Sequence, residues 1–307
     1  MRNDWNLSDI PHLSGRLAVV TGASAGIGFI TARELARRGA TVLLGVRDLA
    51  KGEKAQRRIR AELPDAETRL LHLDLSDLRS VGDAADELRQ TQNKLDLLIN
   101  NAGVMIPPLT RTADGFELQI GVNHLGHFAL TMQLLDLLDT APGARVVTIS
   151  SGAHKIGRPD LDDLNWERRK YRALQAYADS KFANLLFTVE LQRRLAETGS
   201  STLAVAAHPG VAMTELQRHS RLLAASSLPI AHSVEEATLP TLRAATDPDV
   251  RGGDYYGPGK LFELKGAPVI VQPVRRTKDT DSAQRLWTLS EQLTGARLHP
   301  RSGKHAA

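Results

Sequence analysis

Residues 16 to 28 read Arg16-Leu17-Ala18-Val19-Val20-Thr21-Gly22-Ala23-Ser24-Ala25-Gly26-Ile27-Gly28 and join a short apolar run to a glycine-rich turn. The run over 16–21 predicts a buried strand, and helical periodicity over 27–38, ending at Gly39, predicts a helix. Glycine permits positive φ and close backbone approach, and a helix N-terminus attracts phosphate. A tight turn that merely needs glycine is the alternative. The order strand, turn, helix favours a nucleotide phosphate site made by Gly22, Ser24, Gly26, Ile27 and Gly28.

The same turn also matches the pattern GxSxG, with Ser24 at its centre. This pattern forms the nucleophile elbow of α/β-hydrolases, so a serine hydrolase that uses Ser24 is a second interpretation. An elbow of that kind follows several strands of its sheet. Only about one strand of ordinary length fits into the residues before Ser24, which favours the nucleotide site.

Strand-like apolar runs and amphipathic segments alternate along the rest of the chain. Further strands are predicted over 41–46, 69–73, 95–100, 145–149, 202–207 and 253–256. Helices are predicted over 49–63, 76–90 with Ser76 as N-cap, 116–138 as one or two helices, 171–197, 233–245 and 281–293. This order predicts an α/β fold: a single-domain Rossmann-type, doubly wound parallel sheet of about seven strands with helices on both faces. Such sheets bind ligands at the carboxyl ends of their strands.

No composition break or internal repeat interrupts the alternation, so we expect one domain over 15–295. Residues 1–14 predict an irregular leader anchored by Trp5. Residues 209–232 predict a partly apolar lid, and residues 296–307 a flexible basic tail. The apolar residues of the lid favour an apolar ligand, although core packing would look the same.

Composition is that of an ordinary globular protein. Apolar residues make up 42% and charged residues 24% of the 307 positions, and the net charge is +4. Lys and Arg are mixed with acids along helices such as 51–60, which predicts a solvated face and no nucleic-acid partner. Cysteine is absent, which excludes disulfides, thiolate metal sites and cysteine nucleophiles. No apolar run approaches the ~20 residues of a membrane span, and the N-terminus lacks a signal core, so we expect a cytoplasmic protein.

Charged residues at two strand ends bear on the nucleotide. The second predicted strand ends in Gly45-Val46-Arg47-Asp48. An acidic residue there would hold the 2′-hydroxyl of NAD, whereas a guanidinium suits the 2′-phosphate of NADP. Arg47 therefore favours NADP(H) over NAD(H), although Asp48 follows it directly and a solvent-facing Arg47 is the alternative. Asp74, at the end of the third strand, is predicted to accept from the adenine amino group, with a turn or N-cap aspartate as the alternative.

The segment Tyr177-Ala178-Asp179-Ser180-Lys181 lies in the predicted helix over 171–197. Residues four apart share a helix face, so the Lys181 ammonium is expected beside the Tyr177 phenol. A phenol has a pKa of about 10, and a neighbouring cation lowers it, which would let Tyr177 exchange a proton near neutral pH. An ordinary solvated pair is the alternative. Tyr171, on the same predicted helix, lacks a cation four residues on.

Several short segments occur in one order over about residues 15–257. They are Gly22/Gly26/Gly28, Asn100-Asn101-Ala102-Gly103, Asn123, Ser150-Ser151, Tyr177/Lys181 and Pro209-Gly210. In this combination the chain resembles the short-chain dehydrogenase/reductase family. Residues 122–128 and 253–258 are similar to its retinol-dehydrogenase-like branch. Membrane-bound animal members carry an N-terminal anchor that residues 1–14 lack, so the resemblance is to a soluble, bacterial-type member and does not imply retinoid chemistry.

The resemblance implies a role for each position. Tyr177 would be the general acid/base, and Lys181 would lower its pKa and bind the nicotinamide ribose. Ser151 would hydrogen-bond the substrate carbonyl, with Ser150 as the alternative on the other face of the strand. Asn123 would hold a water that relays protons through Lys181, or would simply cap or kink a helix. Cofactor contacts would come from Asp74, Leu75, Asn101, Ala102, Gly103, Tyr177, Lys181, Pro209, Gly210, Val211 and Thr214.

Reducing a carbonyl needs a hydride, a proton and a polarising donor at one carbon. The sequence therefore predicts an NADP-dependent oxidoreductase that interconverts a small, apolar carbonyl compound and a secondary alcohol. A catalytically silent NADP-binding sensor or scaffold is the alternative.

Three further features lead to weaker expectations. No metal site is expected, because the histidines lack ligand spacing with carboxylates; they are His124, His127, His154 and His208. The apolar stripe of Leu185, Leu186 and Val189 predicts, by resemblance, pairing of helices in a homodimer or homotetramer, with packing on the sheet as the alternative. The long stretch 152–176 is predicted to border the substrate site through Trp166 and Tyr171, with an external loop as the alternative.

Overall fold

The computed structural model describes residues 4–210 and 233–298. Its strands are β1 (Leu17–Thr21), β2 (Thr41–Val46), β3 (Thr68–His72), β4 (Leu97–Asn100), β5 (Arg145–Ile149), β6 (Leu203–Ala207), β7 (Tyr255–Lys260) and β8 (Lys265–Ile270). Its longer helices are α1 (Gly26–Arg37), α2 (Leu49–Glu62), α3 (Leu78–Thr91), α5 (Gly126–Asp139), α6 (Ala173–Glu197), α8 (Val234–Thr246) and α9 (Thr280–Thr294). Short turns of helix are η1 (Leu7–Asp9), α4 (Leu118–Ile120), η2 (Gly121–Leu125), η3 (Gly152–Ile156) and η5 (Arg275–Lys278).

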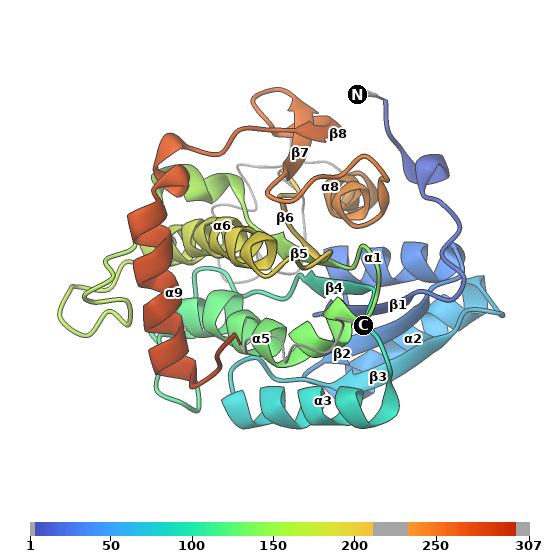
Figure 1. Cartoon of the computed structure of the whole chain (residues 1–307), viewed down its shortest axis with the longest axis horizontal. Coiled ribbons are helices and arrows are strands. Elements are labelled where there is room, and N and C mark those ends of the chain that lie inside the picture. Colours follow the sequence, from blue (N-terminus) through green and yellow to red (C-terminus); the bar gives the residue numbers. More distant parts are fainter. Residues whose placement is uncertain (1–3, 211–232, 299–307) are drawn as a thin grey trace.

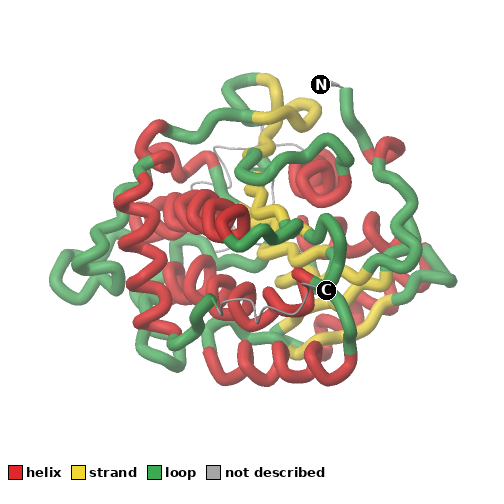
Figure 2. Tube along the Cα trace, viewed as in Figure 1, coloured by secondary structure: helices red, strands yellow, loops and turns green. Residues whose placement is uncertain are grey.

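One twisted sheet runs through the middle of the molecule, between helices on both sides (Figures 1 and 2). Its strand order is β3-β2-β1-β4-β5-β6-β7-β8. Among the strands of the described residues, the pairs from β3 to β7 are parallel, and only β8 runs antiparallel to its neighbour. The predicted doubly wound α/β sheet is therefore confirmed. The strand order reverses between β1 and β4, which is where ligands bind in open parallel sheets.

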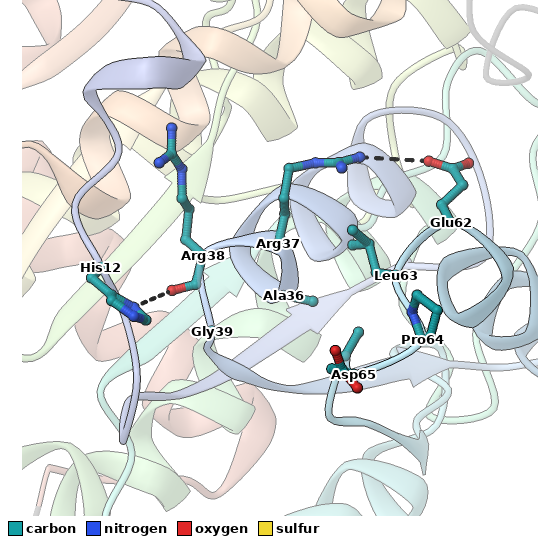
Figure 3. A pocket seen from close by; sticks show the side chains of 10 residues that line it. His12, Ala36, Arg37, Arg38, Gly39, Glu62, Leu63, Pro64 and Asp65 are labelled. Atoms are coloured by element: carbon teal, nitrogen blue, oxygen red, sulfur yellow. Dashed lines mark hydrogen bonds and ion pairs between the residues drawn. The ribbon is translucent and has the colours of Figure 1, made fainter.

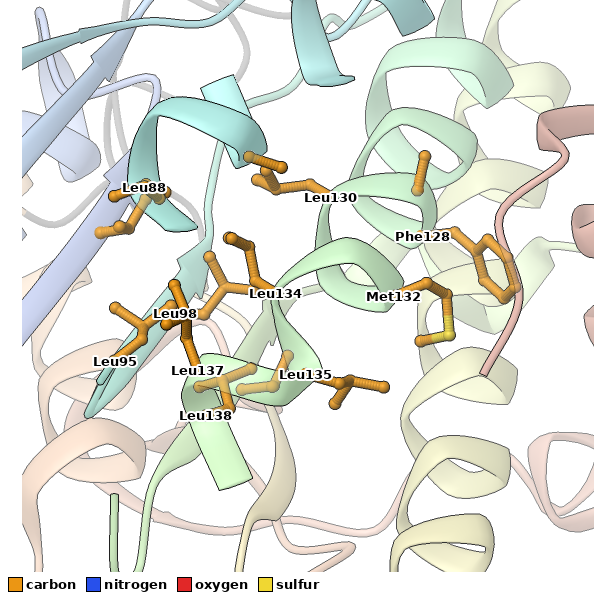
Figure 4. Close-up of a cluster of buried hydrophobic side chains, with 14 of the residues drawn as sticks. Leu88, Leu95, Leu98, Phe128, Leu130, Met132, Leu134, Leu135, Leu137 and Leu138 are labelled. Carbon is orange, nitrogen blue, oxygen red and sulfur yellow. The ribbon is translucent and has the colours of Figure 1, made fainter. Parts of the chain in front are cut away.

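Each strand sends alternate residues into two apolar layers, as a strand's period of two requires. Val19 and Leu98 point into the layer under α3, α5 and α6, whereas Val20 and Ile99 point into the layer under α1, α2 and α8. Figure 4 shows the first layer, where leucines of α3 and α5 meet Leu98 of β4. Because both faces are covered, the central strands are apolar throughout, which is why their runs were recognisable in the sequence.

The structure corrects several element predictions. The sheet has eight strands in the described residues, because β8, not predicted, adds to the edge. The strand predicted over 253–256 begins at Tyr255 and extends to Lys260. Helix α3 is capped by Asp77, because the predicted cap, Ser76, instead donates from Oγ to Asp74 at 2.6 Å.

The segment predicted as one or two helices over 116–138 contains three pieces: α4, the single π-helical turn η2, and α5. In the predicted leader, Trp5 is buried in the layer under α1 and α8, beside the short turn η1.

Helix α9 lies across α5 and α6 at one side of the molecule (Figure 1). Its Leu286 packs against Leu186 of α6, and Leu185 packs against Ala206 of β6. Leu185 and Leu186 of the stripe that was expected to pair between subunits are therefore packed within the chain, whereas Val189 is half-buried; the oligomeric state stays a prediction. Within residues 4–210 and 233–298, no helix is both long and apolar enough to cross a membrane.

Candidate active site

The predicted site residues follow β1, β4, β5 and β6, whose carboxyl ends share one edge of the parallel sheet. Helix α6 packs beside this edge and carries Tyr177 and Lys181 four residues apart. Both side chains are buried, at 7% and 3% exposure, so they are not a solvated surface pair. Lys181 Nζ lies 5.9 Å from the centre of the Tyr177 ring and donates to the Ile149 carbonyl at 3.0 Å.

Burial, and not the lysine, controls the acidity of this pair. Desolvation raises the pKa of Tyr177, and a hydrogen bond with Ser151 partly opposes that rise. The expected lowering of the Tyr177 pKa by Lys181 is therefore wrong for the folded chain by itself. Lys181 is desolvated too, which lowers its own pKa to about 8. A phenol held neutral is suited to donate a proton, and a lysine with a pKa near 8 can pass one on.

The two serines after β5 face opposite ways, as alternation along the strand requires. Ser150 Oγ donates to the Lys181 carbonyl at 2.8 Å, inside the protein. Ser151 bonds to the Tyr177 side chain, and its Oγ also accepts from the Ala153 amide at 3.2 Å at the start of η3. The structure thus brings Ser151, and not Ser150, to the phenol.

Asn123 lies in the π-helical turn η2, which is a common distortion at functional sites. Its Nδ2 donates to the Val104 carbonyl at 3.0 Å and to Ser180 Oγ at 2.9 Å, and its Oδ1 accepts from the Val104 amide at 2.8 Å. A Cβ on Gly103 would lie 3.1 Å from Asn123 Oδ1 and 3.5 Å from Lys181 Nζ. Asn123 therefore joins the segment after β4 to α6 next to Lys181, and the alternative of a distorted helix is observed as well.

The glycine turn after β1 has the conformation that its sequence suggested. Gly22 and Gly26 have φ of +68° and +56°, values that disfavour other residues. A Cβ on Gly28 would lie 2.4 Å from the Gly22 carbonyl oxygen and 2.5 Å from Asn101 Nδ2, so only glycine fits there. Helix α1 begins at Gly26 with no side-chain cap, which leaves its first amides pointing at the turn. Open backbone and free amides form a cradle that fits a pyrophosphate.

Thr21, which the sequence analysis did not single out, holds this cradle to β4. Its Oγ1 accepts from the amides of Asn101 and Ala102, each at 2.9 Å. Asn101 Nδ2 donates to the Thr21 carbonyl at 2.7 Å. Its position directly before Gly22, the first glycine of the turn, is the sequence feature that could have identified Thr21. Ser24 has only β1 before it in the described residues, so the sheet lacks the strands that a hydrolase elbow follows.

The residues predicted to read the adenosine end lie at the ends of β2 and β3. Arg47 is exposed, while Asp48 caps α2 by accepting from the Lys51 amide at 3.1 Å. The carboxylate that weakened the preference for NADP is therefore used within the helix. Asp74 Oδ1 accepts from the amide and hydroxyl of Ser76, so the turn alternative is observed for one of its two oxygens. Leu75 is buried next to it.

Pro209 and Gly210 follow β6 at the same edge, and Gly210 has φ of +72°. The predicted contacts Val211 and Thr214, and most of the predicted lid, lie outside the described residues.

The stretch 152–176 docks on the loop before α4. Tyr171 Oη donates to Glu117 Oε1 at 2.9 Å, and Arg169 stacks over Trp166 at 3.9 Å. The stretch 152–176 is therefore packed against the rest of the chain.

The histidines have ordinary structural partners. His124 Nε2 bonds to Ser290 Oγ at 2.9 Å, and His127 Nε2 bonds to Thr21 Oγ1 at 2.8 Å. Burial lowers their pKa values to about 4 and about 3, so both are neutral. Across the described ranges, no cluster of His, Cys, Asp or Glu is arranged to hold a metal.

A hollow lined by the ends of α1 and α2 lies at the opposite edge of the sheet (Figure 3). There His12 Nδ1 bonds to the Arg38 carbonyl at 3.0 Å, and Arg37 pairs with Glu62 at 3.6 Å. These residues precede the amino ends of β1, β2 and β3, far along the strands from Tyr177. The hollow is therefore separate from the candidate site.

Comparison with known proteins decides the family. A family model described as short chain dehydrogenase matches residues 16–222. The chain belongs to the short-chain dehydrogenase family. It is therefore an NAD(P)-dependent oxidoreductase, as the sequence predicted. The matched range includes the glycine turn, Tyr177 and Lys181.

This short-chain dehydrogenase is similar to retinol dehydrogenases, which confirms the predicted branch. It is 43% identical to human retinol dehydrogenase 13 over 293 residues, which cover 92% of this chain and 86% of that one. It is 43% identical to human retinol dehydrogenase 12 over 290 residues, which cover 93% and 88%.

Solved structures agree with this placement. An uncharacterized protein from Mycobacterium paratuberculosis has 46% identity and a TM-score of 0.82, with 96% of this chain and 99% of that chain covered. The RhlG/NADP active-site complex of Pseudomonas aeruginosa has 25% identity and a TM-score of 0.65, with 83% and 96% covered.

Proposed function

We propose that this oxidoreductase transfers a hydride between NADP(H) and a carbonyl compound or secondary alcohol, with Tyr177 as the general acid/base. The observation that carries the proposal is the buried Tyr177 phenol, which bonds to Ser151 beside Lys181 at the carboxyl edge of the sheet. The nicotinamide, when bound, supplies or accepts the hydride. Everything else that the reaction needs comes from side chains of this chain.

In the direction of reduction, Tyr177 gives its proton to the substrate oxygen while Ser151 donates a hydrogen bond to the same oxygen. Burial keeps the phenol protonated, so the acid is available across the physiological pH range. Lys181, buried four residues along α6 from Tyr177, is the group that returns a proton to Tyr177. In the direction of oxidation, the proton moves the opposite way, from the alcohol to Tyr177 and then to Lys181.

The cofactor would be held by the glycine turn, whose cradle fits a pyrophosphate, and by Arg47 at the end of β2. We propose NADP(H) over NAD(H) because Arg47 is exposed there and Asp48 is used as the cap of α2. The NADP complex of the similar RhlG supports this preference. The homo-oligomer and the cytoplasmic location stay predictions, as does the apolar character of the substrate.

The test is turnover of a broad panel of ketones and aldehydes with NADPH, comparing the wild type with Tyr177→Phe. The variant keeps the ring and loses only the proton, so we expect kcat/KM to fall by about 10²- to 10⁴-fold while NADPH binding and Tm are retained. Full turnover by Tyr177→Phe would contradict the assigned role. Tight NADPH binding by the wild type without turnover of any carbonyl would instead favour the sensor.

A further inference from the structure

Three consecutive residues between β7 and β8 adopt a conformation that side chains rarely tolerate. Leu261, Phe262 and Glu263 have φ of 50°, 56° and 67°. Left-handed backbone is unfavourable at a residue other than glycine, and a run of three persists only when the surrounding contacts hold it. The turn points Phe262 outward, where it is 92% exposed, and points Glu263 inward, where its side chain is 24% exposed.

Glu263 contacts a lysine and a histidine that lie in the turns after two different strands. Its Oε2 lies 3.1 Å from Lys155 Nζ and 3.3 Å from His208 Nε2. Lys155 belongs to η3, the turn that begins directly after Ser151. His208 follows β6 and directly precedes Pro209 and Gly210. One carboxylate therefore joins the turns after β5 and β6, and it does so from the hairpin of β7 and β8.

His208 transmits this contact to the backbone at Gly210. Its Nδ1 accepts from the Gly210 amide at 3.3 Å, so the ring proton is on Nε2, the nitrogen that faces Glu263. The ring is 1% exposed and fits only because residue 257 is glycine: a Cβ there would lie 2.1 Å from Nε2. The His208 side chain lowers the pKa of Glu263 most; burial opposes this and Lys155 adds to it, and the net pKa lies below its ordinary value, so the carboxylate is charged at neutral pH.

The hairpin also touches Gly210 directly. Gly210 has φ of +72°, and a Cβ on it would lie 2.5 Å from the Leu264 carbonyl oxygen and 2.8 Å from Pro258. An exposed ion pair contributes little to stability. Here, however, His208 is fully buried, and the strained turn places the Glu263 carboxylate against it.

We propose that Glu263 is a positioning residue, which ties the turn that carries Ser151 to the turn at Pro209 and Gly210 and so sets the nicotinamide end of the site. The inference rests on the proposed function and on the cofactor contacts that the family resemblance implies for Pro209 and Gly210. Glu263 acts through Lys155 and His208, and it touches neither cofactor nor substrate in this assignment.

The experiment compares Glu263→Gln and Lys155→Met with the wild type. A hydrogen bond to a charged group is worth about a tenfold change in an equilibrium constant, so we expect the Kd and KM for NADPH to rise about tenfold in each variant. We expect kcat to change by less than threefold and Tm by only a few degrees. Because Glu263→Gln already weakens the contact that Lys155→Met removes, the double variant should lose no more than about what Glu263→Gln loses alone.

The matched control is Phe262→Ser, which lies in the same strained turn but points to solvent and should leave both the Kd for NADPH and kcat unchanged. An unchanged Kd in Glu263→Gln and Lys155→Met, with an active wild type, would overturn the positioning role and leave the proposed function intact. An equal loss in Phe262→Ser would also overturn it, because the turn and not the carboxylate would then matter. A wild type that binds no dinucleotide would overturn both proposals.

Discussion

At the scale of single residues, the site is a pair of ionisable side chains that the fold removes from water. Burial disfavours the charged form of each, so the pKa of Tyr177 rises and that of Lys181 falls to about 8. Tyr177 is thus a neutral phenol rather than a phenolate, and Lys181 is an ammonium that loses its proton readily rather than a permanent cation. A cofactor phosphate or ribose near Lys181 would act on values already set by desolvation.

Carbonyl reduction should therefore lose rate as the pH rises through about 8. In the folded protein Lys181 gives up its proton near that pH, and a deprotonated amine cannot resupply Tyr177. We expect kcat to fall above about pH 8 in the wild type. In Lys181→Arg the guanidinium stays protonated, so any remaining activity should show no such fall. A fall at the same pH in Lys181→Arg would assign the titration to another group.

The same shift has a consequence for stability. The unfolded chain keeps Lys181 protonated up to its ordinary value of 10.5, whereas the folded chain releases the proton near 8. Between these values the unfolded state binds more protons, so the contribution of Lys181 to the free energy of unfolding increases with pH in that window. Below about pH 8 its buried charge is a constant cost.

Arg47 should decide the choice of dinucleotide. Arg47→Asp replaces a partner for a 2′-phosphate with a partner for a 2′-hydroxyl. We expect the ratio of kcat/KM for NADPH over NADH to fall by about tenfold or more, since a charged hydrogen bond is lost and repulsion is added. Arg57→Ala is the matched control, because Arg57 is an exposed arginine of α2 that pairs with Glu53 at 3.5 Å. A ratio unchanged by Arg47→Asp would remove the argument for NADP.

At the scale of elements, the cradle depends on how closely β1, α1 and the end of β4 approach one another. Thr21 ties β1 to the segment after β4, and the absence of a Cβ at Gly28 lets α1 begin within contact of Asn101. The distorted turn η2 also joins distant elements, since it places Asn123 against Val104, after β4, and against Ser180 of α6. Each of these contacts joins elements that are distant in sequence.

Gly28→Ala should damage both folding and cofactor binding. The added Cβ would meet the Gly22 carbonyl oxygen at 2.4 Å and Asn101 Nδ2 at 2.5 Å, so the turn must shift. Overpacking of this kind costs about 1–3 kcal/mol of unfolding free energy, and we expect the Kd for NADPH to rise in parallel. Gly82→Ala in α3 is the control. Outside its own helix, the nearest heavy atom of the described residues would lie 3.9 Å from this Cβ. Alanine favours a helix by about 1 kcal/mol over glycine, so stability should rise slightly.

At the scale of the whole molecule, α9 closes the side of the fold that α5 and α6 would otherwise expose. Trp287, which is 2% exposed, stacks on Phe187 of α6 at 6.0 Å and meets Phe128 of α5 edge-on at 5.0 Å. The closing helix is thus part of the main core, although it follows the last strand. A homodimer or homotetramer remains the expectation by family, and light scattering that finds only monomer would remove it.

Trp287→Ala should test how much of the core depends on this helix. Loss of a fully buried tryptophan costs about 3–5 kcal/mol, which we expect as a lower midpoint of urea unfolding. Trp287→Phe should lose much less, because an aromatic ring would remain against Phe187 and Phe128. A change below about 1 kcal/mol in Trp287→Ala would mean that α9 is only loosely attached.

The sequence by itself determined most of the sheet. Residues 17–21, 41–46 and 145–149 are buried on both faces, so each is a continuous apolar run that can be recognised without knowing its neighbours. The glycine turn and the spacing of Tyr177 and Lys181 are also local, since four residues on one helix are enough to place both on one face. These features therefore gave the α/β fold, the family and the main candidate residues.

Only the tertiary structure decided the rest. Strand β8 contains Gly266 and Pro268, and its place depends on antiparallel pairing with β7 at the sheet edge, which no local pattern shows. The sign of the Tyr177 pKa shift depends on how much of the protein surrounds the phenol, and the partners of Glu263 come from turns more than 50 and more than 100 residues away. Periodicity reports which face of an element is apolar, whereas burial, charge and long-range contact depend on what the fold brings against that face.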